Sequence, residues 1–214
     1  MNTDDLIAQL SATAEPVKRL APPMRRACLW LLAIAALSAV PILLRSNLPV
    51  FAQRASDPRM ACELFATLAT GVAAVIAAFH LSLPDRPRTW ALLPLPFALL
   101  WMAMTGWGCL EFLPEQNQRG WGFHQSDYCF VFLLAVGVPL SGLLLLSLRR
   151  ASPLQPRLVA CIGALGAAAL AAFILQFFHP FDVTIMDLGT HIAALAVLIA
   201  VFSLSGRLSL AARR

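Results

Sequence analysis

Six long apolar stretches constrain the fold of this chain more than any other feature of its sequence. They cover residues 27–44, 61–81, 90–110, 129–148, 158–178 and 189–208 and are almost free of Lys and Arg. A helix of about 20 apolar residues crosses the roughly 30 Å of hydrocarbon in a bilayer. Lipid cannot satisfy backbone polar groups, and the alternating pattern of a β-barrel is absent from these stretches, so we expect six transmembrane helices.

The composition agrees with this interpretation. Hydrophobic residues make up 59% of the 214-residue chain and charged residues 13%, whereas soluble domains average about 45–50% and about 25%. A chain this apolar is neither an ordinary soluble domain nor a disordered one. The sequence predicts an all-α membrane protein, with a leader at residues 1–26 and a six-helix transmembrane domain at residues 27–214. The fifth stretch is rich in Gly and Ala, which lets helices approach closely, so we place it inside the bundle.

The basic residues predict the orientation of the chain. Cytoplasmic loops of membrane proteins retain Lys and Arg, whereas exported loops are depleted in them. With six helices, 12 of the 16 Lys and Arg residues lie on the side that holds both termini, and the other four are Arg45, Arg54, Arg59 and Arg119. We therefore expect a multi-pass protein of the bacterial inner membrane with both termini in the cytoplasm. The net charge of +5 reflects this asymmetry, and direct binding to nucleic acid is not expected.

In the leader, residues 3–15 are predicted to form a short amphipathic helix on the cytoplasmic side. The apolar side chains of the leader recur at helical spacing and continue beyond Pro16; they are Leu6, Ile7, Leu10, Val17 and Leu20. A helix this short is marginal alone in water, so its apolar side chains need a partner. Its polar face carries Asp4 and Asp5 rather than the Lys and Arg of a lipid-surface helix, which favours docking on protein. The sequence leaves open whether that protein is the chain's own membrane domain or a separate partner.

Potential ligand side chains collect at the predicted outer ends of the helices. The six that we single out are Cys109, His124, Cys129, His179, Asp182 and His191. Two chemistries fit them. A disulfide between thiols in the oxidising periplasm could act as a redox switch, and thiolate, imidazole and carboxylate groups together could bind copper or zinc. The structural alternative is that the cysteines pack as small hydrophobic residues and the polar groups lie at the interface.

The sequence carries no enzyme signature that its spacing supports. The nearest match to the Gly-x-Ser-Gly turn of a membrane serine protease is Pro139-Leu140-Ser141-Gly142, in which Pro replaces the first Gly. Ser141 would lie about 18 Å below Cys129, far from any outer histidine. No CxxC pair is present for a thiol oxidase. We expect a non-enzymatic protein. The alternative is a small transporter or metal-handling membrane protein, although a transporter should carry ionisable residues at mid-membrane and only Glu63 approaches that position.

Seven short segments of the chain carry a resemblance to a known family. They are Asp4-Asp5-Leu6-Ile7, Pro16-Val17-Lys18-Arg19-Leu20, Leu81-Ser82-Leu83-Pro84, Gly108-Cys109, Tyr128-Cys129-Phe130, Pro153-Leu154 and His179-Pro180-Phe181-Asp182. Each segment is short, but their order and spacing across the six stretches make the combination specific. With the leader and the outer cluster, they resemble the NrsF family of bacterial inner-membrane anti-sigma factors over nearly the whole chain.

The resemblance implies a protein that holds an extracytoplasmic-function sigma factor at the membrane and releases it under metal or oxidative stress. It implies a sigma-binding surface made of the apolar leader residues and of the inner loop around Leu83, Asp85 and Arg86. No cofactor is required for such a function. The expected partners are the sigma factor and the lipid bilayer.

The resemblance also implies sensing by Cys129 together with position 179. Many relatives have Cys-Pro where this chain has His179-Pro180, so no disulfide can form between the two positions here. This difference favours copper or zinc as the signal, because thiolate and imidazole are ligands for both metals. The remaining ligands are expected from Cys109, Asp182 or His191.

Overall fold

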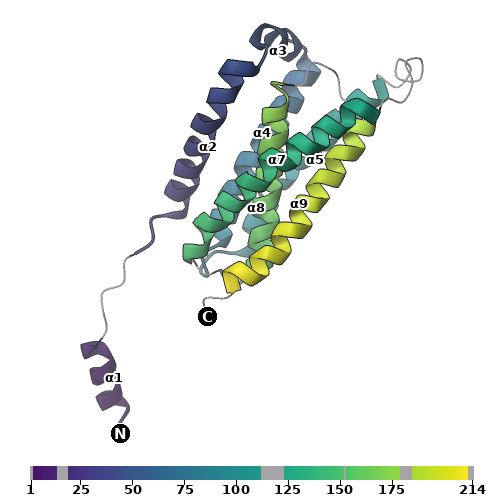
Figure 1. Cartoon of the computed structure of the whole chain (residues 1–214). Helices are drawn as coiled ribbons and strands as arrows, with labels where there is room; N and C mark the ends of the chain where they lie inside the picture. Colours follow the sequence, from purple (N-terminus) through teal and green to yellow (C-terminus); the bar gives the residue numbers. More distant parts are fainter. Residues whose placement is uncertain (1, 14–18, 112–122, 152, 179–184, 212–214) are drawn as a thin grey trace.

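The chain folds into helices throughout the part that the computed structural model describes, which comprises residues 2–13, 19–111, 123–151, 153–178 and 185–211. Side chains are described for all of these except 123–127, 185–187 and 207–211. Within these ranges there is no strand (Figure 1). The helices are α1 (Thr3–Ala12), α2 (Pro23–Arg45), α3 (Leu48–Ala55), α4 (Pro58–Leu81), η1 (Arg88–Leu92), α5 (Leu95–Glu111), α7 (Phe123–Leu148), η2 (Arg149–Ala151), α8 (Pro156–Leu175) and α9 (Ile185–Ala211).

Six helical stretches are long and apolar enough to cross a membrane, as the sequence predicts. They are Pro23–Arg45, Pro58–Leu81, Arg88–Glu111, Tyr128–Ala151, Pro156–Leu175 and Leu188–Gly206. The six passes leave α1 and the end of α9 at the same end of the bundle (Figure 1). We call this end the terminal end and the opposite one, where α3 lies, the α3 end. The prediction of an all-helical protein with six candidate spans is confirmed.

The interior of the bundle is built around α8. This helix packs against α4, α7 and α9, and α4 in turn contacts α2, α3 and α5. Small residues allow the close approach of α8 and α4: a Cβ added at Gly166 would lie 3.1 Å from the backbone nitrogen of Val75. Among the six candidate spans, α8 has the largest buried share. The predicted interior position of the fifth apolar stretch is confirmed, because only small side chains permit this spacing between helices.

Helix α2 is the most peripheral of the spans along the side of the bundle that Figure 1 places at the left. It buries Ala27, Trp30 and Ile34 at helical spacing against a core that includes Phe79 of α4 and Leu144 of α7. Its other apolar side chains, such as Leu32, Leu37 and Leu43, are exposed. An apolar surface of this kind is suited to contact with lipid tails.

Two segments differ from the helices that the sequence predicts. The third apolar stretch divides into η1 and α5. Pro94 and Pro96 lack the N–H that a continuous helix needs at their positions. A new helix, α5, begins after Pro94, whose carbonyl accepts the N–H of Ala98 at 2.9 Å. No helix is predicted between the first two apolar stretches, and the structure forms α3 there. The side chain of Asn47 caps α3 by accepting the N–H of Val50 at 3.3 Å, and Pro49 lies in the first turn.

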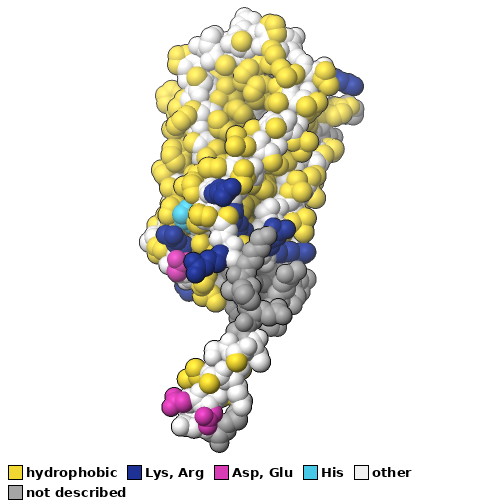
Figure 2. Space-filling model, turned by 90° about the vertical axis from the view of Figure 1, so that its left-hand side faces the viewer, with side chains coloured by type: hydrophobic (Ala, Val, Ile, Leu, Met, Phe, Trp, Pro, Cys, Tyr) yellow, Lys and Arg dark blue, Asp and Glu magenta, His cyan; other side chains and the backbone are white. Residues whose placement is uncertain are grey.

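The arginines of the described chain gather at the terminal end. Of the arginines whose side chains are described, eight lie there, namely Arg19, Arg25, Arg26, Arg86, Arg88, Arg149, Arg150 and Arg157, and three lie at the α3 end, namely Arg45, Arg54 and Arg59. Figure 2 shows most of the blue side chains of that face near the end from which α1 extends, below a long apolar wall. The bundle is therefore electrically asymmetric along its long axis.

Candidate functional site

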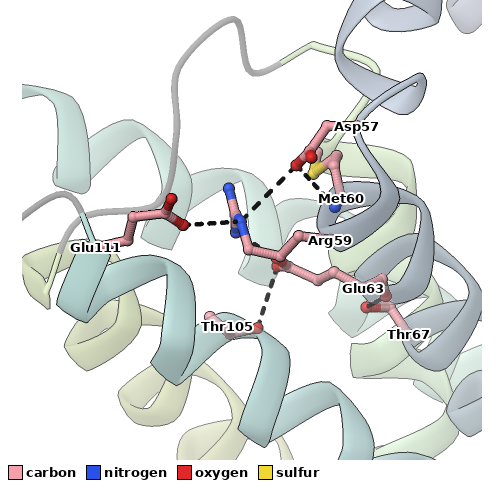
Figure 3. A network of polar contacts seen from close by, with 7 residues as sticks. All are labelled: Asp57, Arg59, Met60, Glu63, Thr67, Thr105 and Glu111. Atoms are coloured by element: carbon pink, nitrogen blue, oxygen red, sulfur yellow. Dashed lines mark hydrogen bonds and ion pairs between the residues drawn. The ribbon is translucent and has the colours of Figure 1, made fainter.

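A polar network built on the first turn of α4 occupies the α3 end (Figure 3). Asp57 caps α4 by accepting the N–H of Met60 at 3.2 Å. The guanidinium of Arg59 lies between three carboxylates: its Nε is 3.8 Å from Oδ2 of Asp57 and 3.6 Å from Oε2 of Glu111, and its Nη1 is 3.7 Å from Oε2 of Glu63. Glu111 belongs to the last turn of α5, so the network joins two helices at their ends.

Glu63 is the buried member of this network. Only 2% of the residue is exposed, and its Oε1 accepts a hydrogen bond from the Thr105 hydroxyl of α5 at 3.1 Å. Arg59 reaches it one helical turn away by crossing Gly108, where an added Cβ would collide with Nη1 of Arg59. A buried carboxylate is tolerated only when it is paired and hydrogen-bonded. Through the contacts of Glu63 with Thr105 and of Arg59 with Glu111, this pair links α4 to α5.

A small cavity lies on the other side of Glu63, between α4, α5, α8 and α9. Its polar lining consists of Glu63, Thr105, Gln176 and His191, and its volume is about 30 Å³. A water molecule needs roughly 10–15 Å³ measured in this way, so the cavity has room for one or two. His191 of α9 and the buried Glu63 of α4 thus line the same cavity. Apolar side chains, among them Trp101, complete the wall.

The predicted sensing residues are distributed over several helices of this end. Cys109 is buried on the face of α5 that also buries Thr105. Cys129 is 1% exposed and packs in a cluster with Leu133, Ala171, Ala172, Leu175 and Ala194. His179, Asp182 and the side chain of His124 lie outside the described residues. Within the described part of the chain, no group of three or more His, Cys, Asp and Glu residues is arranged to hold a metal ion.

Of the predicted set, His191 shares a cavity with Glu63, Cys129 packs in the cluster between α7, α8 and α9, and Cys109 is buried on α5. Ala172 belongs to the Cys129 cluster and also lines the cavity, so it links the two. Neither Arg59 nor Glu63 is among the sensing residues predicted from the sequence. The i, i+4 spacing of the two residues at a helix start was the signal for their pairing.

At the terminal end, α1 presents its apolar side chains to solvent. Leu6, Ile7 and Leu10 are 40%, 58% and 61% exposed, and α1 has no buried residue. Figures 1 and 2 show the helix standing apart from the bundle. A helix is present over Thr3–Ala12, within the predicted range of residues 3–15, with Asp4 and Asp5 in its first turn. Val17 lies outside the described residues.

The predicted inner-loop residues lie beside the first turn of α8. Leu83 and Arg86 line a cavity of about 40 Å³ together with Leu154 and Gln155 of the fourth loop. Asp85 pairs with Arg86, with 3.7 Å between Oδ2 and Nε, and both side chains are exposed. Residues 82–87, between α4 and η1, and residues 153–155, before α8, therefore form one surface. Leu20 is exposed and lies instead beside α2.

The chain matches a protein-family model over nearly its whole length. The model is described as NrsF, negative regulator of sigma F, and the match covers residues 10–211. No curated protein and no solved structure gives a significant match.

Proposed function

Because the chain belongs to the NrsF family of negative regulators of sigma F, we propose that it is a membrane-bound, non-enzymatic anti-sigma factor of the bacterial inner membrane. In this proposal it holds an extracytoplasmic-function sigma factor at its terminal end, away from RNA polymerase. A periplasmic metal or redox signal at the α3 end releases the sigma factor. No cofactor is needed for either step.

The distribution of arginine supports the orientation. Of the arginines whose side chains are described, eight lie at the terminal end and three at the α3 end. Positive side chains are retained on the cytoplasmic side of membrane proteins. We therefore assign the terminal end, with both termini, to the cytoplasm, where a sigma factor is present.

The exposure of Leu6, Ile7 and Leu10 is the observation that carries the assignment of the binding surface. The three side chains occupy neighbouring positions of α1 and contact no core of the described bundle. An isolated helix of 10 residues is marginal in water. Burying its apolar face in a groove of another protein is a common mode of helix recognition and would stabilise it. Of the two partners that the sequence left open, this favours a separate protein.

We assign a second contact to the loop surface of Leu83, Asp85 and Arg86. Arg86 of the exposed Asp85–Arg86 pair lines a cavity together with Leu154 and Gln155. This surface lies at the same end of the bundle as α1. One sigma factor bound at that end would therefore be able to reach both.

The direct test replaces Leu6, Ile7 and Leu10 together by Ala in the full chain, which is affinity-tagged and expressed in bacteria. Alanine keeps helix propensity, so the variant loses contacts rather than the helix. The control carries Gln9→Ala and Ser11→Ala in the same helix. We expect a sigma factor to co-purify with the wild type and the control but not with the triple variant. Full retention of the sigma factor by the triple variant would place the interface elsewhere.

For the signal, we propose copper or zinc binding at the α3 end by Cys129 and His179, completed by Cys109, His124, Asp182 or His191. The support from the structure concerns packing. Cys129 lies in a layer shared by α7, α8 and α9, and Ala172 links this layer to the cavity of Glu63 and His191. A ligand that moved Cys129 would therefore act on the helices that form the bundle interior. Coupling to the cytoplasmic surface requires two discrete arrangements of these helices.

A further inference from the structure

A groove of about 1020 Å³ runs between α2 and α7 at the terminal end. Its walls come from the first turns of α2, from the last turns of α7 and from residues 19–21 of the leader, and Phe79 of α4 contributes to its floor. Pockets that enclose a drug-sized molecule measure about 300–1,000 Å³. The groove is thus large enough for a phospholipid head group and the first part of its tails.

Three guanidinium groups surround this groove. They belong to Arg19 before α2, Arg26 in the first turn of α2 and Arg150 in η2, the short helix that follows α7. None of the described residues that line the groove is acidic. The groove therefore concentrates positive charge at the level where both spans end, which is the depth of lipid phosphates.

Arg26 is fixed by one hydrogen bond, while other N–H donors of its guanidinium remain unused. Its Nη2 donates to the carbonyl oxygen of Ser147 at 2.6 Å, and its guanidinium carbon lies 5.1 Å from the centre of the Phe79 ring. Its Nη1 is buried and has no hydrogen-bond partner among the described residues. A guanidinium has five N–H donors and binds phosphate through two of them at once. A small rotation about the Ser147 contact would turn the unused edge of Arg26 toward an anion in the groove.

Trp30 supplies an independent indication at the next turn of α2. It is 8% exposed, lines the same groove, and its indole Nε1 is buried with no hydrogen-bond partner in the described part of the chain. A buried indole N–H normally has an acceptor. Beyond it, the exposed side chains of Leu29, Leu143 and Leu146 continue the groove as an apolar wall.

We propose that this groove is a binding site for an anionic phospholipid. The phosphate lies among Arg19, Arg26 and Arg150, the ester oxygens face the Trp30 side, and the acyl chains follow the leucines of α2 and α7. The groove includes residues 19–21, so the bound lipid also fixes the point at which the leader leaves the membrane domain. The inference does not depend on which protein the leader binds.

Two matched pairs of variants test the site. In the first pair, Arg26→Gln removes a charge that lines the groove and Arg25→Gln removes the neighbouring exposed charge that does not line it. In the second pair, Arg150→Gln and Arg149→Gln do the same after α7. The two variants of each pair have the same net charge and lie at the same level of the bundle. The second pair keeps the test valid if loss of the Arg26–Ser147 hydrogen bond impairs folding.

The measurement is native mass spectrometry of the full-length protein in detergent, titrated with phosphatidylglycerol or phosphatidylcholine. We expect a preference of at least about tenfold for phosphatidylglycerol, reduced roughly tenfold in Arg26→Gln and clearly in Arg150→Gln, as loss of a charge-assisted hydrogen bond predicts. The two control variants should bind like the wild type. Equal binding of the two lipids, or equal loss within each pair, would overturn the proposal.

Inorganic phosphate provides the second arm of this experiment. A lipid site derives part of its affinity from the acyl chains, so millimolar phosphate should not displace phosphatidylglycerol. Complete displacement by phosphate would show that the groove binds a free anion, and the assignment to lipid would then be wrong.

Discussion

Removing Arg59 should destabilise the bundle far more than removing the charge of its partner Glu63. In Arg59→Met, the Glu63 carboxylate stays in a site that leaves 2% of the residue exposed. Breaking a buried ion pair from one side costs about 3–5 kcal/mol. Since the side chain of Arg59 is itself 19% exposed, water can reach the position that it vacates, and we expect the lower end, about 3 kcal/mol.

Glu63→Gln should cost only about 1 kcal/mol, the net value of one ordinary hydrogen bond. The amide keeps the shape of the carboxylate and can still accept the Thr105 hydroxyl that is now 3.1 Å away. Arg59 retains Asp57 and Glu111, whose side chains are 51% and 56% exposed. Such exposed pairs contribute about 0–1 kcal/mol each. Arg59 therefore keeps two carboxylate partners and some contact with water when Glu63 loses its charge.

The double variant Arg59→Met/Glu63→Gln measures the coupling energy between Arg59 and Glu63. It buries a neutral amide instead of a charged carboxylate that has lost the Arg59 guanidinium. We therefore expect it to cost about 2 kcal/mol rather than the additive value of about 4, a coupling within the range for residues in contact. The assay is reversible unfolding in mixed micelles with increasing dodecyl sulfate, followed by circular dichroism. Glu111→Gln, at an exposed position, is the control and should change the free energy of unfolding by less than about 1 kcal/mol. Additive costs of the two single substitutions would refute this reasoning.

Two further predictions concern helix packing and metal binding. Gly166→Ala should lower the free energy of unfolding by about 1–3 kcal/mol, because its Cβ would press on the backbone of Val75, whereas Gly142→Ala, with nothing described within 4 Å, should raise it by up to about 1 kcal/mol in the same unfolding assay. Titration of the purified chain with Cu(I) or Zn(II) should reveal a site that Cys129→Ser and His179→Ala each abolish; unaltered affinity in both variants would contradict the metal proposal.

The six spans could be predicted from the sequence because a helix that crosses the hydrocarbon of a bilayer must be apolar over its whole length. Apolar length alone therefore identifies such segments, and the Gly and Ala content of α8 identifies the one inside. The break between η1 and α5 was harder to predict from the sequence. Pro94 and Pro96 predict a distortion, but whether a proline bends a helix or begins one depends on which carbonyl the next N–H groups find.

The polar network shows where sequence reasoning ends. The spacing of Arg59 and Glu63 is visible along the chain, but the hydroxyl that completes the pair comes from Thr105, 42 residues away. His191 reaches the same cavity from another helix. No local pattern specifies such meetings, because they depend on how α4, α5 and α9 pack. For the same reason the sequence could not decide whether α1 docks on its own bundle.

The central claim is that α1 holds a sigma factor through its apolar face. It is tested most directly by the affinity of the full chain, embedded in nanodiscs, for the sigma factor that co-purifies with it. Replacing Leu6, Ile7 and Leu10 by Ala should weaken this affinity at least about 100-fold, which corresponds to about 2.8 kcal/mol and is well within what burial of three such side chains provides. An affinity within about threefold of the wild type would contradict the account.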